Sequence, residues 1–209
     1  MGLSCLTDST AAIVIDASTA INLNATGCAP AILKALPNRA RVTETVVAEL
    51  EAGRRTGRRN GELIADLLGR SLLEVVRMND SQERLFESLI IGSAVDTLDD
   101  GEAATIAVAL DGHAVAIIDE RKANRICAQR YPQVRTGCTI DLFAHEAVQS
   151  VLGAAALGDA IFAALQQARM RTLPRHLEWV VSMIGQDRAP LCPSLPRSVR
   201  CRPSVAKAG

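Results

Sequence analysis

Short apolar runs and longer segments with helical periodicity alternate along most of the chain. The runs lack the alternation of polar and apolar residues that is typical of a strand with one solvent-exposed face. This indicates strands of a parallel sheet that is buried on both faces. Five such strands are predicted, at residues 11–15, 40–43, 72–77, 114–118 and, most weakly, 133–136.

The segments between these strands repeat apolar residues at spacings of three and four, which predicts helices that pack one face against a sheet. These helices are predicted at 18–24, 29–36, 44–52, 61–69, 81–92, 101–110 and 120–130, and three more follow the last strand at 140–152, 159–171 and 174–184. Strands that alternate with helices indicate an α/β fold with a largely parallel sheet.

The composition changes near residue 186. Beyond it, Pro190, Pro193, Pro196 and Pro203 stand among arginines, a pattern that cannot sustain a helix and offers little apolar surface to bury. We therefore expect residues 186–209 to form a flexible tail, which is dispensable for the folding of a domain at residues 10–185.

Composition and charge narrow the class of protein. The 209 residues are 48% hydrophobic and only 2% aromatic, which fits one globular domain with an extension and excludes disordered and fibrous chains. The 23 basic residues balance 23 acidic ones, so the net charge gives no indication of the class of binding partner.

The six cysteines form no C-x-x-C pair and the first residues lack a signal-peptide profile, which predicts free thiols in a reducing cytoplasm. Polar residues interrupt the apolar stretch 147–165, so we expect no membrane segment. Phosphate-binding glycine motifs are absent from the sequence.

Two predicted strands end on a carboxylate, Asp16 and Asp119. Ligands of open α/β sheets bind outside the carboxyl ends of strands, so these residues are candidates for a site. The alternative is that each aspartate caps the helix that follows it, a common role for this residue type.

Two helical glutamates add to this set. Glu102 shares a helix face with apolar residues, although Asp99 and Glu102 also have the spacing of a capping box. Glu49 and Glu51 flank an apolar stripe on opposite sides, and periodicity alone does not show which of them belongs to the candidate site. For Glu51, an ordinary solvated helix position is the simpler interpretation.

The acids occur in the segments IVIDASTAINL, VTETVVAELEAG, LDDGEAATIAVALD and VAIIDERKANRIC, in that order. In this order and context they resemble the PIN domain family of metal-dependent nucleases, over about residues 11–152. The resemblance implies a three-layer α/β/α sandwich around a mostly parallel sheet of about five strands, followed by C-terminal helices.

The same resemblance implies an acidic cluster of Asp16, Glu49, Glu102 and Asp119, with Ser18 and Thr139 as supporting polar residues. The family often has Asp where Glu102 stands and glycine where Asn124 stands. Converging carboxylates favour Mg²⁺ or Mn²⁺ as cofactor. Zinc is disfavoured, because the three histidines have no ligand spacing with one another or with cysteines.

The implied activity is metal-dependent hydrolysis of single-stranded RNA by a toxin-like endoribonuclease, with an antitoxin protein and a second copy of the chain as further partners. Four arginines between two helices could contact phosphates, or could simply be solvated: Arg54, Arg55, Arg58 and Arg59. The few aromatic residues argue against a base-stacking platform. The competing hypothesis is a PIN-like module that binds a partner without catalysis.

Overall fold

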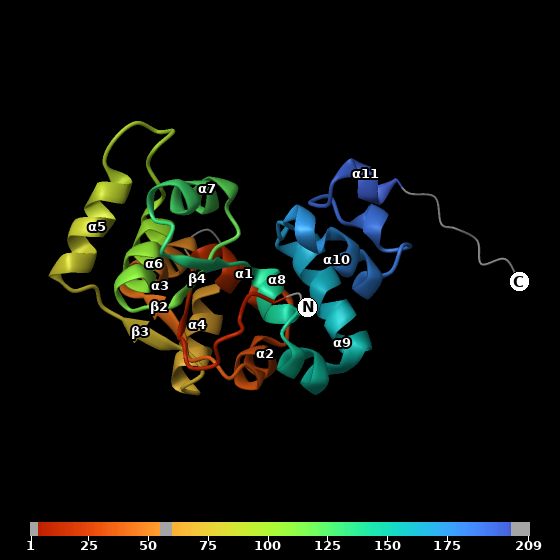
Figure 1. The fold of residues 1–209 in the computed structure, drawn as a ribbon. Helices are drawn as coiled ribbons and strands as arrows, with labels where there is room; N and C mark the ends of the chain where they lie inside the picture. Colours follow the sequence, from red (N-terminus) through yellow and green to blue (C-terminus); the bar gives the residue numbers. More distant parts are fainter. Residues whose placement is uncertain (1–3, 55–59, 202–209) are drawn as a thin grey trace, which may run out of the picture.

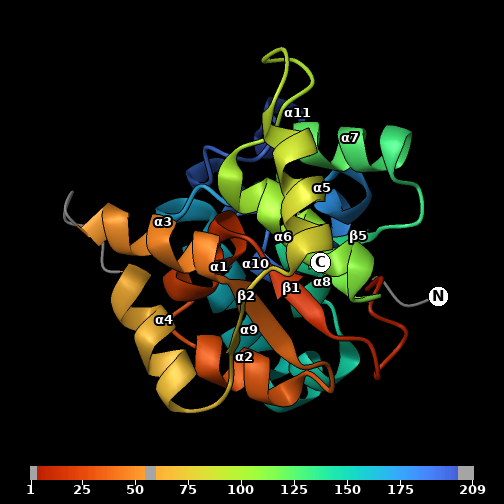
Figure 2. The ribbon, with the colours of Figure 1, turned by 90° about the vertical axis from the view of Figure 1, so that its left-hand side faces the viewer.

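A five-stranded parallel sheet forms the centre of the computed structural model, which describes residues 4–54 and 60–201. The strands are β1 (Ile13–Ile15), β2 (Ala40–Thr43), β3 (Glu74–Val76), β4 (Val115–Ile117) and β5 (Arg135–Gly137). Their order is β3-β2-β1-β4-β5, and β1 lies beside β2 as Figure 2 shows. All five strands occur where the sequence predicts them, to within a few residues.

Successive residues of β1 point to opposite faces of the sheet, and each face is fully buried. Ile13 and Ile15 belong to one apolar cluster, with residues of α1, α2, α4 and α9. Val14 belongs to the other, with residues of α5, α6 and α7. Helices therefore cover both faces, which explains why the strand sequences are continuously apolar and confirms the three-layer architecture.

The helices of the sheet region begin and end close to the predicted positions. They are α1 (Ala17–Ala25), α2 (Ala29–Ala35), α3 (Glu44–Arg54), α4 (Asn60–Gly69), α5 (Asp80–Ile90), α6 (Asp100–Asp111) and α7 (Arg121–Arg130). Local signals account for several of the starts: the side chain of Asn79, for example, caps α5 in a capping box with Gln82.

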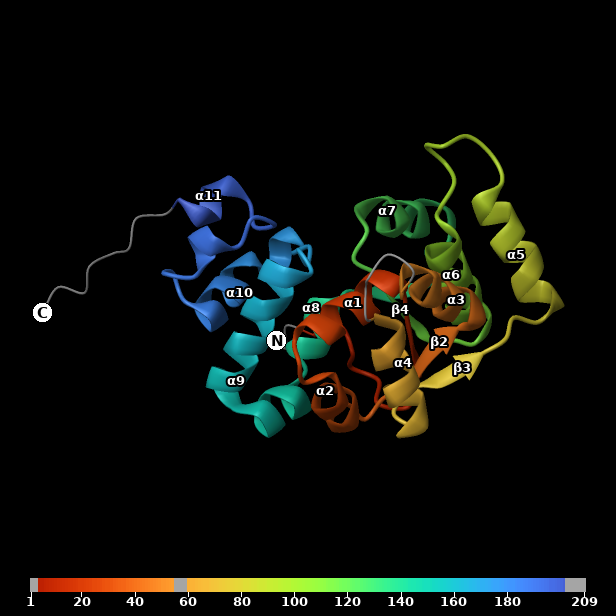
Figure 3. The ribbon, with the colours of Figure 1, turned by 180° about the vertical axis from the view of Figure 1, so that it is seen from behind.

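The region after the sheet departs from the prediction of two helices at 140–152 and 159–171. A short helix α8 (Thr139–Phe143) ends early, and α9 (Glu146–Gln167) begins where the His145 side chain accepts a hydrogen bond from the amide of Ala147. Gly153 then breaks α9 with a φ of 72°, a conformation that glycine adopts without steric cost. In Figures 1 and 3, α9 to α11 gather on the side away from α5.

Within the described residues, α9 alone has the length and apolar composition of a membrane span, with a mean hydropathy of 1.6. Its break at Gly153 leaves two pieces that are each too short to cross a bilayer. Leu157, Ile161 and Leu165 are buried in the main apolar cluster. These contacts are those of a core helix.

The expectation of a flexible tail from residue 186 is wrong for residues 189–195. After η1 (Pro174–His176) and α10 (Leu177–Ile184), the chain forms a 3₁₀ turn, η2 (Ala189–Leu191), and a short helix, α11 (Arg197–Arg200). Ala189, Cys192 and Leu195 are at most 2% exposed and join the main core. Prolines prevent a long helix here, but a 3₁₀ turn tolerates them and still aligns every third residue on one face.

Candidate active site

The site lies at the point where the strand order reverses. Strand β1 has β2 on one side and β4 on the other, so the connections after β1 and β4 leave the sheet in opposite directions and open a crevice between them. Ile15 pairs with Ile117; Asp16 directly follows Ile15, and Asp119 lies two residues after Ile117. The predicted placement of both aspartates at strand ends is confirmed, and the two strands are neighbours in the sheet.

Asp119 is held by donors from two helices. Its carboxylate accepts hydrogen bonds from the Thr139 hydroxyl at 2.5 Å, the Thr139 amide at 2.8 Å and the Asn22 side chain at 2.6 Å. Burial raises the pKa of Asp119, and these three hydrogen bonds oppose the rise. Asp119 does not cap α7, so its orientation is set by Thr139 and Asn22.

The turn after Asp119 is stabilised by Asn124. Its side-chain amide donates to the carbonyl oxygens of Ile118 and Glu120, each at 2.9 Å. These two hydrogen bonds hold the segment that follows Asp119.

Asp16 fills two roles at once. One carboxylate oxygen, Oδ1, accepts the amide of Thr19 at 2.7 Å and so caps α1, as the alternative interpretation expects. The other, Oδ2, is buried and has no hydrogen-bond partner in the part of the chain that the structure describes. Burial, followed by the charges of Asp119 and Glu102, raises the pKa of Asp16 to about 7.

Glu102 stands in the first turn of α6 and is half-buried. Its pKa rises to about 7 because of burial and of the neighbouring charges of Asp99 and Glu120. The Asp99 side chain caps no amide of α6, so the predicted capping box does not form. The charge of Glu102 acts on Asp16, which links this helix to the strand-end aspartates.

Glu49, on α3, lies against the first turn of α6. Its carboxylate lies against Gly101, where a Cβ atom would be 2.5 Å from Glu49 Oε2. Burial and the charges of Asp99 and Asp100 raise the pKa of Glu49. Glu49 is nevertheless exposed, and its place in a common cation site with Asp16 stays a prediction. Glu51 is exposed.

A cleft of about 220 Å³ opens beside Asp119. The exposed Ser18 and the side of Asn22 form one wall, and Arg169 and Arg171 from the turn after α9 form another. Arg171 makes an ion pair with Glu120 at 2.5 Å. The C-terminal helices therefore bring positive charge to the edge of the acidic cluster.

The predicted arginine patch lies only partly among the described residues. Arg54 is the last residue of α3, and Arg55, Arg58 and Arg59 lie outside the part of the chain that the structure describes.

Sequence reasoning missed Asn22, Arg169 and Arg171. A local signal existed for Asn22, because Asp16, Thr19 and Asn22 are spaced by three residues and so share one side of a helix. For the two arginines no local signal existed, since their place beside Asp119 depends on how α9 packs on α1.

The comparison with known proteins agrees with this geometry. A family profile described as DUF3368, a PIN domain, matches residues 12–186, more than four fifths of the chain. The chain belongs to the PIN domain family. No curated protein and no solved structure matches it. Membership of this PIN family indicates a nuclease-type function in general terms, and PIN domains generally use divalent metals.

The side chains of this PIN domain fit a hard divalent cation. The unpartnered Oδ2 of Asp16 is a buried anionic oxygen that lacks a donor among the described residues, and the charges of Asp119 and Glu102 act on the same carboxylate. A cation would relieve their repulsion, and oxygen ligands of this kind match Mg²⁺ or Mn²⁺.

Proposed function

We propose that the chain is a Mg²⁺- or Mn²⁺-dependent endoribonuclease that hydrolyses phosphodiester bonds of single-stranded RNA. The observation that carries the proposal is the carboxylate of Asp16, buried with one free oxygen and repelled by Asp119 and Glu102. A buried, unpaired carboxylate is costly to maintain for stability alone, which favours a functional reason for it.

The chain's own residues would orient the cation ligands in advance. Thr139 and Asn22 fix the carboxylate of Asp119, and the Thr19 amide fixes Asp16 through Oδ1 and leaves Oδ2 free. Glu102 would complete the set, and Glu49 is a further candidate ligand. When bound, the cation supplies Lewis acidity and lowers the pKa of a water molecule for attack on phosphorus.

Arg169 and Arg171 are the side chains best placed to hold the RNA backbone near these acids. Both line the cleft beside Asp119 and both are exposed. The backbone of Arg169 has a φ of 54°, a conformation that costs a non-glycine residue about 1 kcal/mol. The next residue, Met170, is buried and anchors the turn that carries Arg169. Contacts of this kind recognise phosphates without reading bases.

The proposal extends to the cellular role. We propose that the chain acts in the cytoplasm as the toxin of a toxin-antitoxin pair, neutralised by an antitoxin protein and able to form a homodimer. Family membership is what supports this part of the proposal.

A cleavage assay tests the activity. Labelled single-stranded RNA and single-stranded DNA of the same sequence are incubated with the full chain and Mg²⁺ or Mn²⁺, then with EDTA. We expect cleavage of RNA that EDTA abolishes and that Asp16→Asn and Glu102→Gln reduce at least ~100-fold. Asp66→Asn, an exposed acid paired with Arg70, should leave the rate unchanged.

Cleavage of the DNA alone would contradict the proposal that RNA is the substrate. Cleavage that survives EDTA would contradict the proposed requirement for a metal ion. A folded wild-type chain that cuts neither strand with either cation would favour the alternative of a PIN-like binding module.

A further inference from the structure

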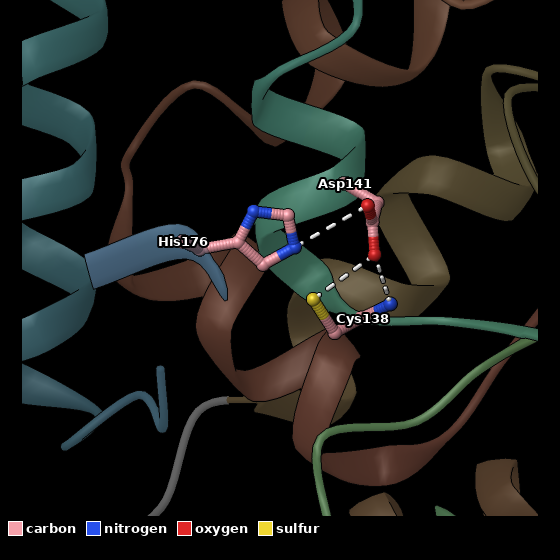
Figure 4. A group of neighbouring side chains, drawn as sticks. All are labelled: Cys138, Asp141 and His176. Atoms are coloured by element: carbon pink, nitrogen blue, oxygen red, sulfur yellow. Dashed lines mark hydrogen bonds and ion pairs between the residues drawn. The ribbon is translucent and has the colours of Figure 1, made fainter. Parts of the chain in front are cut away.

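A second cluster of ligand-type side chains lies next to the acidic site, at the start of α8. Cys138 and Asp141 are three residues apart, so the first turn of the helix brings both side chains together. His176 reaches them from η1, in the C-terminal helical region (Figure 4). The Cys138 thiol donates to Asp141 Oδ2 at 3.1 Å, and His176 Nε2 lies 3.4 Å from Asp141 Oδ1.

The cluster is sealed from solvent. Cys138, Asp141 and His176 are each at most 1% exposed. His176 Nδ1 is buried and has no partner among the described residues, which is an uncommon state for a buried polar atom. Neither the proposed hydrolysis nor the packing of the core accounts for an imidazole in this position.

The donor set selects a class of metal. One thiol, one imidazole and one carboxylate are the ligands of zinc and of similar transition metals, whereas Mg²⁺ prefers oxygen alone. The three ligand atoms lie within 4.8 Å of one another. Ligands of a tetrahedral Zn²⁺ are roughly 3.5 Å apart, so small movements would bring the three atoms to bonding positions.

A fourth ligand is also close. The backbone amide of Cys5 donates to Asp141 Oδ1 at 3.1 Å. A Cβ atom on Gly137 would lie 2.8 Å from Cys5 Sγ and 3.6 Å from Asp141 Oδ2, which places the Cys5 thiol at the edge of the same cluster. Either this thiol or a water molecule can take the fourth position of a tetrahedral site.

We propose that Cys138, Asp141 and His176 form a zinc site, separate from the acidic cluster, that fastens the C-terminal helices to the nuclease core. The site joins the end of β5 to η1, two regions that are far apart in the sequence. Thr139, which positions Asp119, lies between two of the ligands, so zinc would also stabilise the orientation of Asp119. The inference does not depend on nuclease activity.

Arg175 is the group that competes with the metal. Its guanidinium donates to Asp141 Oδ2 at 3.0 Å and to His176 Nε2 at 3.1 Å, and so supplies positive charge to the metal-free cluster. The Arg175 side chain is 55% exposed and can turn toward solvent. Zinc and Arg175 would therefore exclude each other, and removal of Arg175 should strengthen metal binding.

Cobalt absorption tests the site on the full chain. The host protein carries Asp16→Asn, which weakens any cation site in the acidic cluster, and Cys5→Ser, which removes the other thiol at the edge of the proposed site. After chelator treatment and removal of the chelator, Co²⁺ is titrated while the visible and near-ultraviolet spectra are recorded. We expect one Co²⁺ per chain, with intense tetrahedral ligand-field bands and a thiolate charge-transfer band, both removed by Zn²⁺.

Three variants in the same host distinguish a zinc site from a cluster held by hydrogen bonds alone. Cys138→Ser should lose the thiolate band. Arg175→Gln, which keeps all three ligands, should bind Co²⁺ roughly fivefold more tightly, since a half-exposed ion pair of about 1 kcal/mol no longer competes. Arg188→Gln, which removes an exposed ion pair with Asp159 in the same C-terminal region, should leave the affinity unchanged.

The proposal is overturned if the folded host shows no thiolate band at millimolar Co²⁺, or if Cys138→Ser keeps it. If Cys138→Ser does not fold, as judged by circular dichroism, the comparison of Arg175→Gln with Arg188→Gln decides. Equal affinities in that comparison would identify the cluster as a hydrogen-bonded clamp without metal.

Discussion

Replacing Asp16 with asparagine should stabilise the metal-free protein at alkaline pH. The pKa of Asp16 rises from 3.8 to about 7 on folding, mainly because the carboxyl group is buried and secondly because Asp119 is charged. Each tenfold change in proton affinity corresponds to ~1.4 kcal/mol, so the charged form costs the folded state at most about 4 kcal/mol. Asparagine has no charge and can still cap α1 through its side-chain oxygen.

The sign of the pH dependence follows from the raised pKa. Between pH 3.8 and about 7 the folded chain binds more protons at Asp16 than the unfolded chain. The stability of the wild type should therefore fall as the pH rises through this window, and Glu102 acts in the same direction. The gain from Asp16→Asn should be largest at pH 8 and should shrink toward pH 4.

Thermal unfolding in EDTA measures this effect. If asparagine removes half of the cost of the buried charge, the free energy of unfolding of the variant rises by about 2 kcal/mol, which raises Tm by about 5 °C at pH 8. Asp66→Asn at an exposed helix position is the control and should shift Tm by less than ~1 °C at any pH. A variant that is less stable than the wild type at pH 8, or a difference independent of pH, would refute the reasoning.

Three further predictions concern activity, packing and RNA binding. Thr139→Val removes a hydroxyl donor but keeps the shape of the side chain. It should lower the rate of RNA cleavage about tenfold without loss of fold, because one charged hydrogen bond is lost. An unchanged rate would argue against a role of Thr139 in orienting Asp119. Leu195→Ala should lower the free energy of unfolding, measured in urea, by about 3 kcal/mol. Leu191 is 57% exposed, so Leu191→Ala should lower it by less than ~0.5 kcal/mol. Equal small effects would mean that this segment does not pack on the core. Arg169→Ala should weaken RNA binding more at low salt than at high salt, and Arg70→Ala, whose partner is a surface acid, should not.

The strand ends could be predicted because their signal is local. An apolar run that stops at an aspartate, as in Ile13–Ile15 before Asp16, reports both the buried strand and the residue at its carboxyl end. The general rule for parallel sheets then places Asp16 and Asp119 at one crevice. The depth of their burial, and the free oxygen of Asp16, depend on packing that no local pattern records.

The C-terminal part could not be predicted for the same reason. Prolines between Pro190 and Pro203 correctly exclude a long helix, but they do not report that Cys192 and Leu195 meet the core. Likewise, histidine spacing along the sequence gives no sign that His176 lies beside Cys138. Both features come from contacts between segments far apart in the chain.

Mn²⁺ binding to the acidic cluster tests the central claim most directly. Metal-free full chain is titrated with Mn²⁺ at pH 8 and the unbound ion is counted by electron paramagnetic resonance, for the wild type, Asp16→Asn and Asp66→Asn. The account predicts that Asp16→Asn binds Mn²⁺ at least ~10-fold more weakly than the other two proteins. It also predicts that wild-type affinity falls as the pH drops below about 7, where protons compete for Asp16 and Glu102. Equal Mn²⁺ affinity in all three proteins would contradict a cation site built on Asp16.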